Sequence, residues 1–536
     1  MTDKRENLNS MFSVQNPLAY RTSARKQITP CVCLLIVVLL ASANLALARQ
    51  LPPNGPPLTC PRCTGLGTVT NVSDYGAKGD GITDDYAAIH AAVATLTSGG
   101  TLCFPPGSYR IGRGAGRTLF NGGLELAGVH NITVEFAGGA QIYMDNINPA
   151  TGLGDQAHGI LILGGSAGIR LINPKVVWNW SKGTVNRSVG DCIRVYGGGT
   201  PASTDVVDDV EIEGGYVEKC PNVGIQTMGA TRVKIVNNTI DQSGGDGINA
   251  NAGNHLMITG NTITSAGDDA IGLITYHGDA GTCLALNCGY GFNSPDITSW
   301  NLNGSTVTGN TIEYCVGGIH ASGDSDVAIV GNNIAGNAGT GLSSISDKTG
   351  LTACSGYGCP LLANKNVVFA GNTVSNTRLG ILAQSYNATL YDSDDWVRHE
   401  VSFVGNTIRA TPAGEDSIRG WTVKGLNLAA NSVATTNANS GVTLYETANS
   451  SVSNLTITGE TNYIVIGDET YPNSVTYAVT DATGEPVGIV ETSNVPTSPS
   501  WPQAGMGLGS RSIHPDRSLM SAILKQRHMG DWLVWK

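Results

Sequence analysis

The sequence is poor in charge and in aromatic side chains. Only 14% of its 536 residues are Asp, Glu, Lys or Arg and 6% are Phe, Trp or Tyr, while 41% are hydrophobic. A disordered chain carries more charge and less apolar sequence, so this composition excludes a largely disordered protein. The formal net charge is −11, and no basic stripe stands out that would neutralise phosphates. A nucleic-acid partner is therefore not expected.

Glycine and asparagine, by contrast, are frequent and recur in a repeated motif. The motif reads "VNNTIDQSGGDGI" at 236–248, "TGNTITSAGDDAI" at 259–271 and "TGNTIEYCVGGI" at 308–319, and further copies follow. Its anchoring asparagines are Asn238, Asn261, Asn310, Asn332, Asn372 and Asn406. The steps between them are 23, 49, 22, 40 and 34 residues, which indicates a short repeat that carries insertions.

Each repeat alternates short β-branched runs with Asn and Gly turns, which predicts three short strands per unit. Such a unit is too small to bury a core alone. Stacked units pair each strand in parallel with the next at about 4.8 Å and fill a central column with aliphatic side chains. We therefore predict an all-β fold, a single-stranded parallel β-helix. A leucine-rich-repeat solenoid needs regular leucines and a helical segment in each unit, and neither is visible.

The open N-terminal end of this solenoid has a predicted cap at 72–112, "VSDYGAKGDGITDDYAAIHAAVATLTSGGTLCFPPGSYRIG". Asp84 and Asp85 are expected to act as N-caps of a helix over 86–96, and strands follow it. We assign this pair of carboxylates to capping rather than to catalysis.

The pattern "YGAKGDGITDD…GGTLCFPPGSY" in this cap resembles the start of the pectin-lyase-like β-helix superfamily, which includes polygalacturonases, pectate-lyase-like proteins and phage tailspikes. With the repeats, the resemblance covers about residues 70–460. It implies a right-handed β-helix with an N-terminal capping helix, similar to polygalacturonase-like (glycoside hydrolase family 28-like) proteins. The superfamily hosts hydrolases, lyases, epimerases and non-enzymes, so the fold names no single activity.

Three aspartates occupy equivalent places in two successive repeats. Asp246 and Asp269 each lie eight residues after their anchoring asparagine, and Asp268 directly precedes Asp269. If the repeats stack in register, the three carboxylates reach one surface patch, where mutual repulsion raises some of their pKa values. That arrangement suits acid/base chemistry on a glycosidic bond. A calcium site and a purely structural turn ladder are the alternatives that spacing alone leaves open.

The resemblance assigns roles to these carboxylates. The segments "GGDG" and "GDDA" are similar to the "NTDG" and "GDD" motifs of polygalacturonases. This implies that Asp268 is the general acid, and that Asp246 and Asp269 hold and deprotonate the attacking water, with inversion at the anomeric carbon.

The sequence departs from the polygalacturonase pattern on the next two repeats. In register, Gly317 stands where that family has the histidine of "GHG", and Ser343 stands where it has the arginine of "RIK". His320 or His277 is the candidate substitute for the histidine, and we retain His320 as a candidate catalytic residue. Arg378 and Lys365 are candidate cations for an acidic sugar. The departures put galacturonate in doubt as the substrate.

The N-terminal 48 residues have the parts of a secretory signal. Three basic residues precede the apolar run "CVCLLIVVLLASANLALA", which ends in a small-x-small pattern. We predict a signal peptide at 1–48, with an uncleaved anchor as the alternative, and a linker at 49–70. The β-helix domain is predicted at 71–465, a C-terminal cap region at 466–494, and a Pro/Gly linker and tail of unknown role at 495–536.

Export permits disulfides among the cysteines outside the signal. Cys283 with Cys288 and Cys354 with Cys359 are placed to close local loops. A zinc or redox role for the CxxC of residues 60–63 is weakly supported. The remaining four are expected to be buried, paired or not, and are Cys103, Cys192, Cys220 and Cys315.

Together these features predict a secreted, monomeric glycoside hydrolase of polygalacturonase-like type that acts on a cell-wall polysaccharide. No cofactor is expected. A polysaccharide lyase or epimerase that uses Ca²⁺ on an acidic glycan is one alternative, and a non-catalytic glycan-binding or structural β-helix is another.

Overall fold

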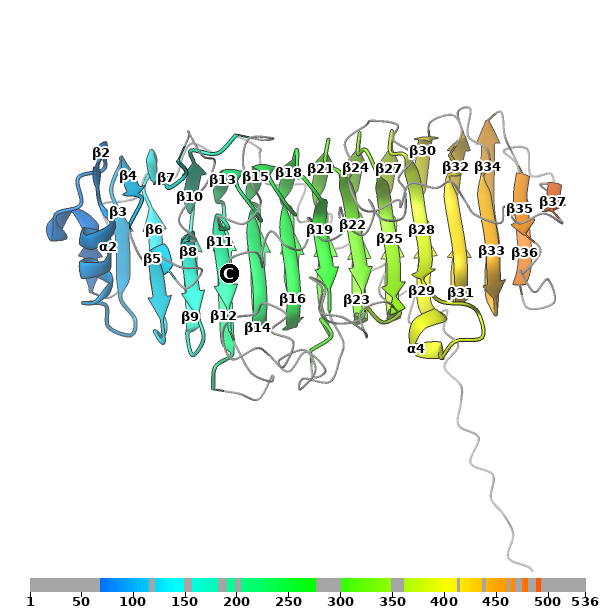
Figure 1. Cartoon of the computed structure of the whole chain (residues 1–536), viewed down its shortest axis with the longest axis horizontal. Helices are drawn as coiled ribbons and strands as arrows, with labels where there is room; N and C mark the ends of the chain where they lie inside the picture. Colours follow the sequence, from blue (N-terminus) through cyan, green and yellow to red (C-terminus); the bar gives the residue numbers. More distant parts are fainter. Residues whose placement is uncertain are drawn as a thin grey trace, which may run out of the picture. The chain divides into compact units, whose positions relative to one another are not determined.

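The computed structural model describes residues 68–492 apart from 115–120, 149–156, 182–189, 198–203, 276–299, 349–360, 412–414, 436–439, 460–462, 468–474 and 481–487. All of them lie in one compact unit, Pro53–Lys536. The described residues form a right-handed parallel β-helix, as predicted. All of its paired strands are parallel, and each strand pairs with its counterpart on the neighbouring coil, so that the strands stand side by side in chain order (Figure 1).

The coil has three faces, and the first, face A, carries the candidate site. Face A consists of β5 (Asn121–Ala127), β8 (Ala157–Leu163), β11 (Ile193–Tyr196), β14 (Ile225–Val236), β16 (Ile248–Asn254), β19 (Asp269–Ile274), β22 (Gly317–Ser322), β25 (Thr340–Asp347), β28 (Leu379–Tyr386), β31 (Ile418–Ala429), β33 (Val442–Ala448), β35 (Tyr463–Gly467) and β37 (Gly488–Thr492). The long strands β14 and β31 bend and continue into the second face.

The other two faces have the same stacking. Face B consists of β1 (Val69–Asn71), β3 (Thr101–Phe104), β6 (Thr133–Phe136), β9 (Ala167–Ile172), β12 (Val207–Glu213), β17 (Met257–Thr259), β20 (Thr306–Thr308), β23 (Ser325–Val330), β26 (Lys365–Ala370), β29 (Arg398–Val404), β34 (Ser450–Gly459) and β36 (Val475–Thr480), with the ends of β14 and β31. Face C consists of β2 (Asp80–Asp84), β4 (Gly107–Gly112), β7 (Ala140–Asp145), β10 (Lys175–Trp178), β13 (Tyr216–Cys220), β15 (Thr239–Ser243), β18 (Thr262–Thr264), β21 (Thr311–Glu313), β24 (Asn333–Ala335), β27 (Thr373–Ser375), β30 (Thr407–Thr411) and β32 (Ser432–Thr435).

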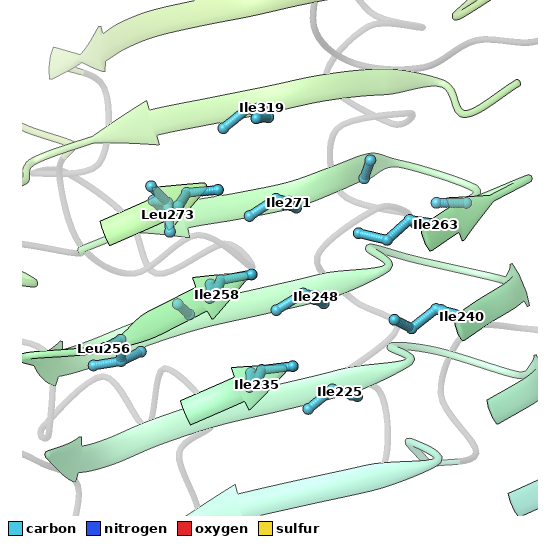
Figure 2. Packing of buried hydrophobic residues seen from close by; sticks show 14 of the residues in the cluster. Ile225, Ile235, Ile240, Ile248, Leu256, Ile258, Ile263, Ile271, Leu273 and Ile319 are labelled. Atoms are coloured by element: carbon cyan, nitrogen blue, oxygen red, sulfur yellow. The ribbon is translucent and has the colours of Figure 1, made fainter. Parts of the chain in front are cut away.

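The core is a set of aliphatic columns inside the coil. Figure 2 shows Ile225, Ile248, Ile271 and Ile319 one above another on successive strands of face A, and all four are buried. Burial of one such side chain contributes about 1.5–3 kcal/mol relative to its exposure. Because aliphatic residues recur at the same place in each coil, this contribution repeats along the helix axis and favours one register.

A buried asparagine ladder at the corner between faces B and C also holds the register. Each anchoring asparagine donates its side-chain amide to Oδ1 of the next, at 3.1, 3.0, 2.9, 2.9 and 2.9 Å from Asn238 to Asn406. The ladder continues to Asn431, at 3.0 Å from Asn406. The preceding residue adopts a left-handed conformation, φ 66° at Gly260, which explains the recurrent Gly-Asn pair.

The N-terminal cap contains a short 3₁₀ turn, η1 (Val72–Tyr75), and helix α2 (Tyr86–Val93). The helix is shorter than the predicted 86–96, because Thr95 N and Oγ1 both bond Ala92 O and close its last turn. The capping prediction is wrong in part. Asp84 Oδ1 accepts the Tyr86 N–H at 3.2 Å, but the Asp85 carboxylate makes no cap bond and instead accepts from Lys78 N and Gly79 N.

The four cysteines expected in strands are buried. Cys192 and Cys220 form a disulfide across neighbouring coils, and Cys103 is also disulfide-bonded. Cys315 forms no disulfide, and its Sγ accepts the Ala266 N–H at 3.4 Å. The two local cysteine pairs and the CxxC lie outside the described residues. A second helix, α4 (Asp394–Val397), has only four residues. In the described part of the chain, no helix is long and apolar enough to cross a membrane.

Candidate active site

The three aspartates meet at the corner where face C turns into face A. One carboxylate oxygen from each of Asp246, Asp268 and Asp269 lies within 4.8 Å of the other two. Asp246 and Asp269 are buried, with 5% and 6% of their surface exposed, and Asp268 is partly exposed. The register counted from the asparagine ladder is confirmed, because Gly247 N donates to Asp269 O at 3.0 Å between the two coils.

The turn before β19 brings Asp268 onto the same patch as its neighbour. Along a regular strand, adjacent side chains point to opposite faces. Here Gly267 N donates to Ser243 O and Gly245 O, and Asp268 N donates to Gly245 O, so this segment follows the turn of the previous coil. Asp269 is the first residue of β19. The strand alternation of side chains therefore begins only after Asp268 and Asp269, so both carboxylates can lie on the same side.

His320 lies against this cluster, reaching back to it from β22. Its Nδ1 is 3.0 Å from Asp269 Oδ2, and its Nε2 is 2.8 Å from Ser322 Oγ. Gly317 pairs with Asp269 in the parallel register, as predicted. A Cβ at position 317 would stand 2.0 Å from Asp269 Oδ1, so only glycine leaves this carboxylate its place.

These hydrogen bonds determine where protons stand around His320. The Ser322 hydroxyl donates its one proton to Ile345 O at 2.7 Å, so Ser322 Oγ accepts from His320 Nε2. Nδ1 then faces Asp269 Oδ2 across a bond that also needs a proton, carried by either the carboxyl or the imidazole. The pair thus holds one proton inside the cluster of carboxylates.

Asp246 has a different partner. The side-chain amide of Asn249 donates to Asp246 Oδ2 at 2.5 Å, and Asn251 Nδ2 lies 3.5 Å from Asn249 Oδ1. A donor aimed at a carboxylate favours its ionised form. The sequence analysis missed Asn249, although its signal is visible three residues after the aspartate in "DGIN".

Sequence reasoning also missed a buried arginine on face A. Arg194 lies on the same row of face A as Asn249, two coils earlier, through the register Arg194↔Gln226↔Asn249. Its Nη1 is 3.4 Å from Asp191 Oδ2, and His158 Nδ1 is 3.3 Å from the same oxygen. Burial raises the pKa of Asp191, but Arg194 and His158 outweigh that effect and hold the pKa below its usual value.

The cations proposed for an acidic sugar have other partners. Arg378 pairs with Glu415 at 2.7 Å. Lys365 begins β26 on face B and pairs with Asp395 at 3.6 Å, so the interpretation that it serves a site on face A is wrong. Ser343 pairs with His320 in the register and brings no charge. His277 lies outside the described residues.

The three carboxylates also fit a hard cation in part. Ca²⁺ takes six to eight oxygen ligands at about 2.3–2.6 Å, and the cluster offers three within its 4.8 Å span. Two of the carboxylates are already hydrogen-bonded, Asp246 to Asn249 and Asp269 to His320. A bound Ca²⁺ ion would need further oxygen ligands besides these three.

Family models match most of the β-helix. The "Rhamnogalacturonase A/epimerase, pectate lyase-like" model matches residues 69–157, and the "Right handed beta helix region" model matches 158–294 and 296–414. Among curated proteins, mannuronan C5-epimerase AlgE4 of Azotobacter vinelandii is 44% identical over 64 residues, and alginate lyase 7 of the same organism is 54% identical over 46. These matches cover 11% and 8% of this chain and only 12% and 5% of the relatives.

Solved structures share the fold. A family 28 exopolygalacturonase of Yersinia enterocolitica aligns with a TM-score of 0.51 and 15% identity over 79% of this chain and 80% of its own. A GH87 α-1,3-glucanase of Streptomyces thermodiastaticus aligns with a TM-score of 0.50 and 20% identity over 80% and 69%. Identities this low speak for the fold alone. The matched family models and the observed coil together show that the chain belongs to the pectate-lyase-like right-handed β-helix superfamily.

Proposed function

We propose that this protein is a glycoside hydrolase that cleaves a polysaccharide with the aspartates of face A. The observation that carries the proposal is the convergence of Asp246, Asp268 and Asp269 within 4.8 Å, with a histidine bonded to one of them. Hydrolysis of a glycosidic bond needs one protonated carboxyl for the leaving oxygen and one carboxylate for the water.

The contacts of each carboxylate support a division of roles. Asp268 is the most exposed of the three, and we assign it protonation of the leaving oxygen. Asp246 is held as an acceptor by Asn249, which suits the residue that takes a proton from water. Asp269 shares a proton with His320 and positions the water between the two coils. His320 thereby acts through Asp269.

The stereochemical outcome is part of the proposal. Inverting enzymes usually separate their carboxyl groups by about 6.5–9.5 Å to admit a water, and retaining enzymes by about 5–5.5 Å. The nearest oxygens here lie within 4.8 Å. Inversion is therefore supported by the motif resemblance rather than by the spacing, and the anomer first formed must be measured.

The test is a comparison of wild-type protein with Asp268→Asn on a panel of polysaccharides. Loss of the general acid should lower kcat by about 10²–10⁴-fold, read as new reducing ends, without a change in melting temperature. The matched control is Asp326→Asn, because Asp326 is exposed and lies on face B rather than face A. This variant should keep full activity. Proton NMR of the first product distinguishes inversion from retention. Full activity of the Asp268→Asn variant would overturn the proposal.

A calcium-dependent lyase or epimerase is the second candidate, because the carboxylates can contribute ligands to Ca²⁺ and short stretches match an alginate epimerase and an alginate lyase. Such an enzyme loses activity when EDTA removes Ca²⁺. A lyase also leaves an unsaturated product that absorbs in the ultraviolet, whereas a hydrolase leaves only reducing ends.

We also propose that the protein is exported after cleavage of residues 1–48. The basic residues and the apolar run of this segment support it. N-terminal sequencing of the protein from the culture medium tests the cleavage site.

A further inference from the structure

We propose that the glycan bound on face A is uncharged: the substrate is a neutral polysaccharide rather than a polyuronate. The inference rests on the proposed function, because it concerns the polymer at the same aspartates. Two observations support it, namely the pairing of the cations on this face and a set of buried polar atoms that have no partner.

The described Lys and Arg residues on and beside strands β11 to β28 of face A already have carboxylate partners. In the face A part of these strands the one described Lys or Arg is Arg194, which pairs with the fully buried Asp191. Four others lie just outside the face and are also paired. Arg232 and Lys234, on the part of β14 that belongs to face B, pair with Asp208 and Glu211, and Lys348 and Arg378 pair with Asp392 and Glu415. A uronate carboxylate on this surface would have to compete with an existing partner for each described cation.

The sequence extends this point to the undescribed segments that follow β19 and β25 along the chain. Residues 276–299 and 349–360 contain neither Lys nor Arg, whereas 276–299 contain two aspartates. Among the undescribed segments between β10 and β28, only 182–189 carries such residues, Lys182 and Arg187. An anionic polymer would approach three carboxylates with little positive charge to receive it.

The polar atoms without partners indicate what the ligand offers. Gln226 Oε1 and Asn251 Oδ1 have no hydrogen-bond partner, although the two residues are only 3% and 5% exposed. Both lie on face A, where Ile225 and Ala250 fill the core and the alternate residues point outward. Buried acceptors of this kind need a donor. A sugar hydroxyl, which neutral and acidic sugars both carry, can donate to these oxygens, whereas an ionised carboxylate cannot, so no uronate carboxylate occupies these two positions.

Arg194 extends the same row. Its Nε is buried without a partner, and the side chain is 8% exposed. Because Asp191 already balances its charge, a hydroxyl oxygen can accept from Nε with no change in net charge. A carboxylate at this position would instead bring an unbalanced charge into a nearly dry site. The row Arg194, Gln226, Asn249 continues through Gly272 to His320, and Asn249 bonds Asp246. A sugar bound at Gln226 therefore lies on the row that passes the aspartates.

The first experiment measures binding of full-length Asp268→Asn protein to matched polymers. Polygalacturonate and its fully methyl-esterified form share one backbone and differ in charge, and alginate, α-glucan and xylan complete the panel. We expect an uncharged polymer to bind tightest, at least tenfold above either polyuronate at low salt, and added salt to improve binding of the polyuronates. Tightest binding to a polyuronate, or binding to no polymer, overturns the inference.

This result is independent of the hydrolysis test. If a neutral polymer binds but wild-type protein forms no reducing ends from it, the proposed hydrolase fails while the inference stands. If reducing ends form fastest from a polyuronate, the hydrolase stands and the inference fails.

Two variants test the residues. Gln226→Met keeps the shape and removes an unpartnered oxygen, so affinity for the neutral polymer should fall at least tenfold with no loss in melting temperature. Unchanged affinity with a lower melting temperature would show a structural role and contradict the inference. Gln384→Lys places an unpaired cation at a partly exposed position of β28, two coils beyond Ser322, and should raise polyuronate affinity severalfold, whereas Gln384→Met should not. Equal affinities for these two variants would overturn the charge argument.

Discussion

The asparagine ladder allows a quantitative prediction about stability from two adjacent residues. Asn332 is 1% exposed and makes four side-chain hydrogen bonds. Its Nδ2 donates to Val307 O at 3.1 Å and Asn372 Oδ1 at 2.9 Å, and its Oδ1 accepts from Asn310 N and Nδ2, both at 2.9 Å. Asn333, the next residue, is exposed at the start of β24.

Asn332→Ala removes all four bonds and leaves a buried main-chain N–H without its acceptor. At about 1 kcal/mol for each bond, and about 1–3 kcal/mol for an orphaned group, the free energy of unfolding should fall by about 5–7 kcal/mol. Asn333→Ala should change it by less than about 0.5 kcal/mol. The same substitution at neighbouring positions thus separates ladder bonding from any general effect of alanine.

Urea unfolding followed by circular dichroism measures the difference. Hydrogen exchange of the main-chain amides of residues 308–312 shows whether the loss is local to the two coils that lose bonds, as expected of a stacked repeat. A loss below about 1 kcal/mol for Asn332→Ala, or equal losses for both variants, would refute the reasoning that side-chain bonds between coils hold the register.

Three further predictions concern the site and its support. Gly317→Ala should lower kcat by about 10²-fold with little change in KM, because the new Cβ would stand 2.0 Å from Asp269 Oδ1 and displace that carboxylate. Steady-state kinetics of the soluble variant measure this effect, and a wild-type kcat would contradict it. Burial lowers the pKa of His399 to about 3, below its ordinary value near 6.5, so the unfolded chain binds the extra proton between these two pH values. Stability should therefore fall as pH drops from 6.5 towards 3, by up to about 1.4 kcal/mol per pH unit, and His399→Gln should lack this component in pH-dependent urea melts. Replacing both Cys192 and Cys220 by Ala should lower the free energy of unfolding by about 3–4 kcal/mol, because the disulfide joins residues 28 apart in the sequence. An unchanged melting temperature of the double variant would contradict this prediction.

The asparagine count predicted the coil and the stacked carboxylates correctly for a physical reason. A buried amide must find its partner on the next coil, so the spacing from each asparagine to the residues after it repeats. Asp246 and Asp269 share that spacing and therefore lie side by side. The extra residues between 275 and 300 did not disturb the ladder, because Asn261 N still donates to Asn310 Oδ1 at 2.9 Å between the coils on either side of them.

The position of His320 could not be counted in the same way. The register places Gly317 beside Asp269, and sequence spacing alone therefore suggested an unfilled position. The imidazole reaches Asp269 from three residues further along the strand. Side-chain length and direction decide such a contact, and neither follows from periodicity.

The sequence by itself determined the repeat, the parallel coil and the shared patch of three aspartates, because periodic burial and hydrogen bonding admit one stacking. The tertiary structure decided what surrounds that patch. Arg194 and Asp191 are near in sequence, but other coils bury this ion pair. Gln226 and Asn251 lie on neighbouring strands of face A only because 23 residues make one turn here. Contacts between coils decide which charges are paired and which buried polar atoms have no partner within the protein. In our proposal, these contacts determine which polymer binds to face A.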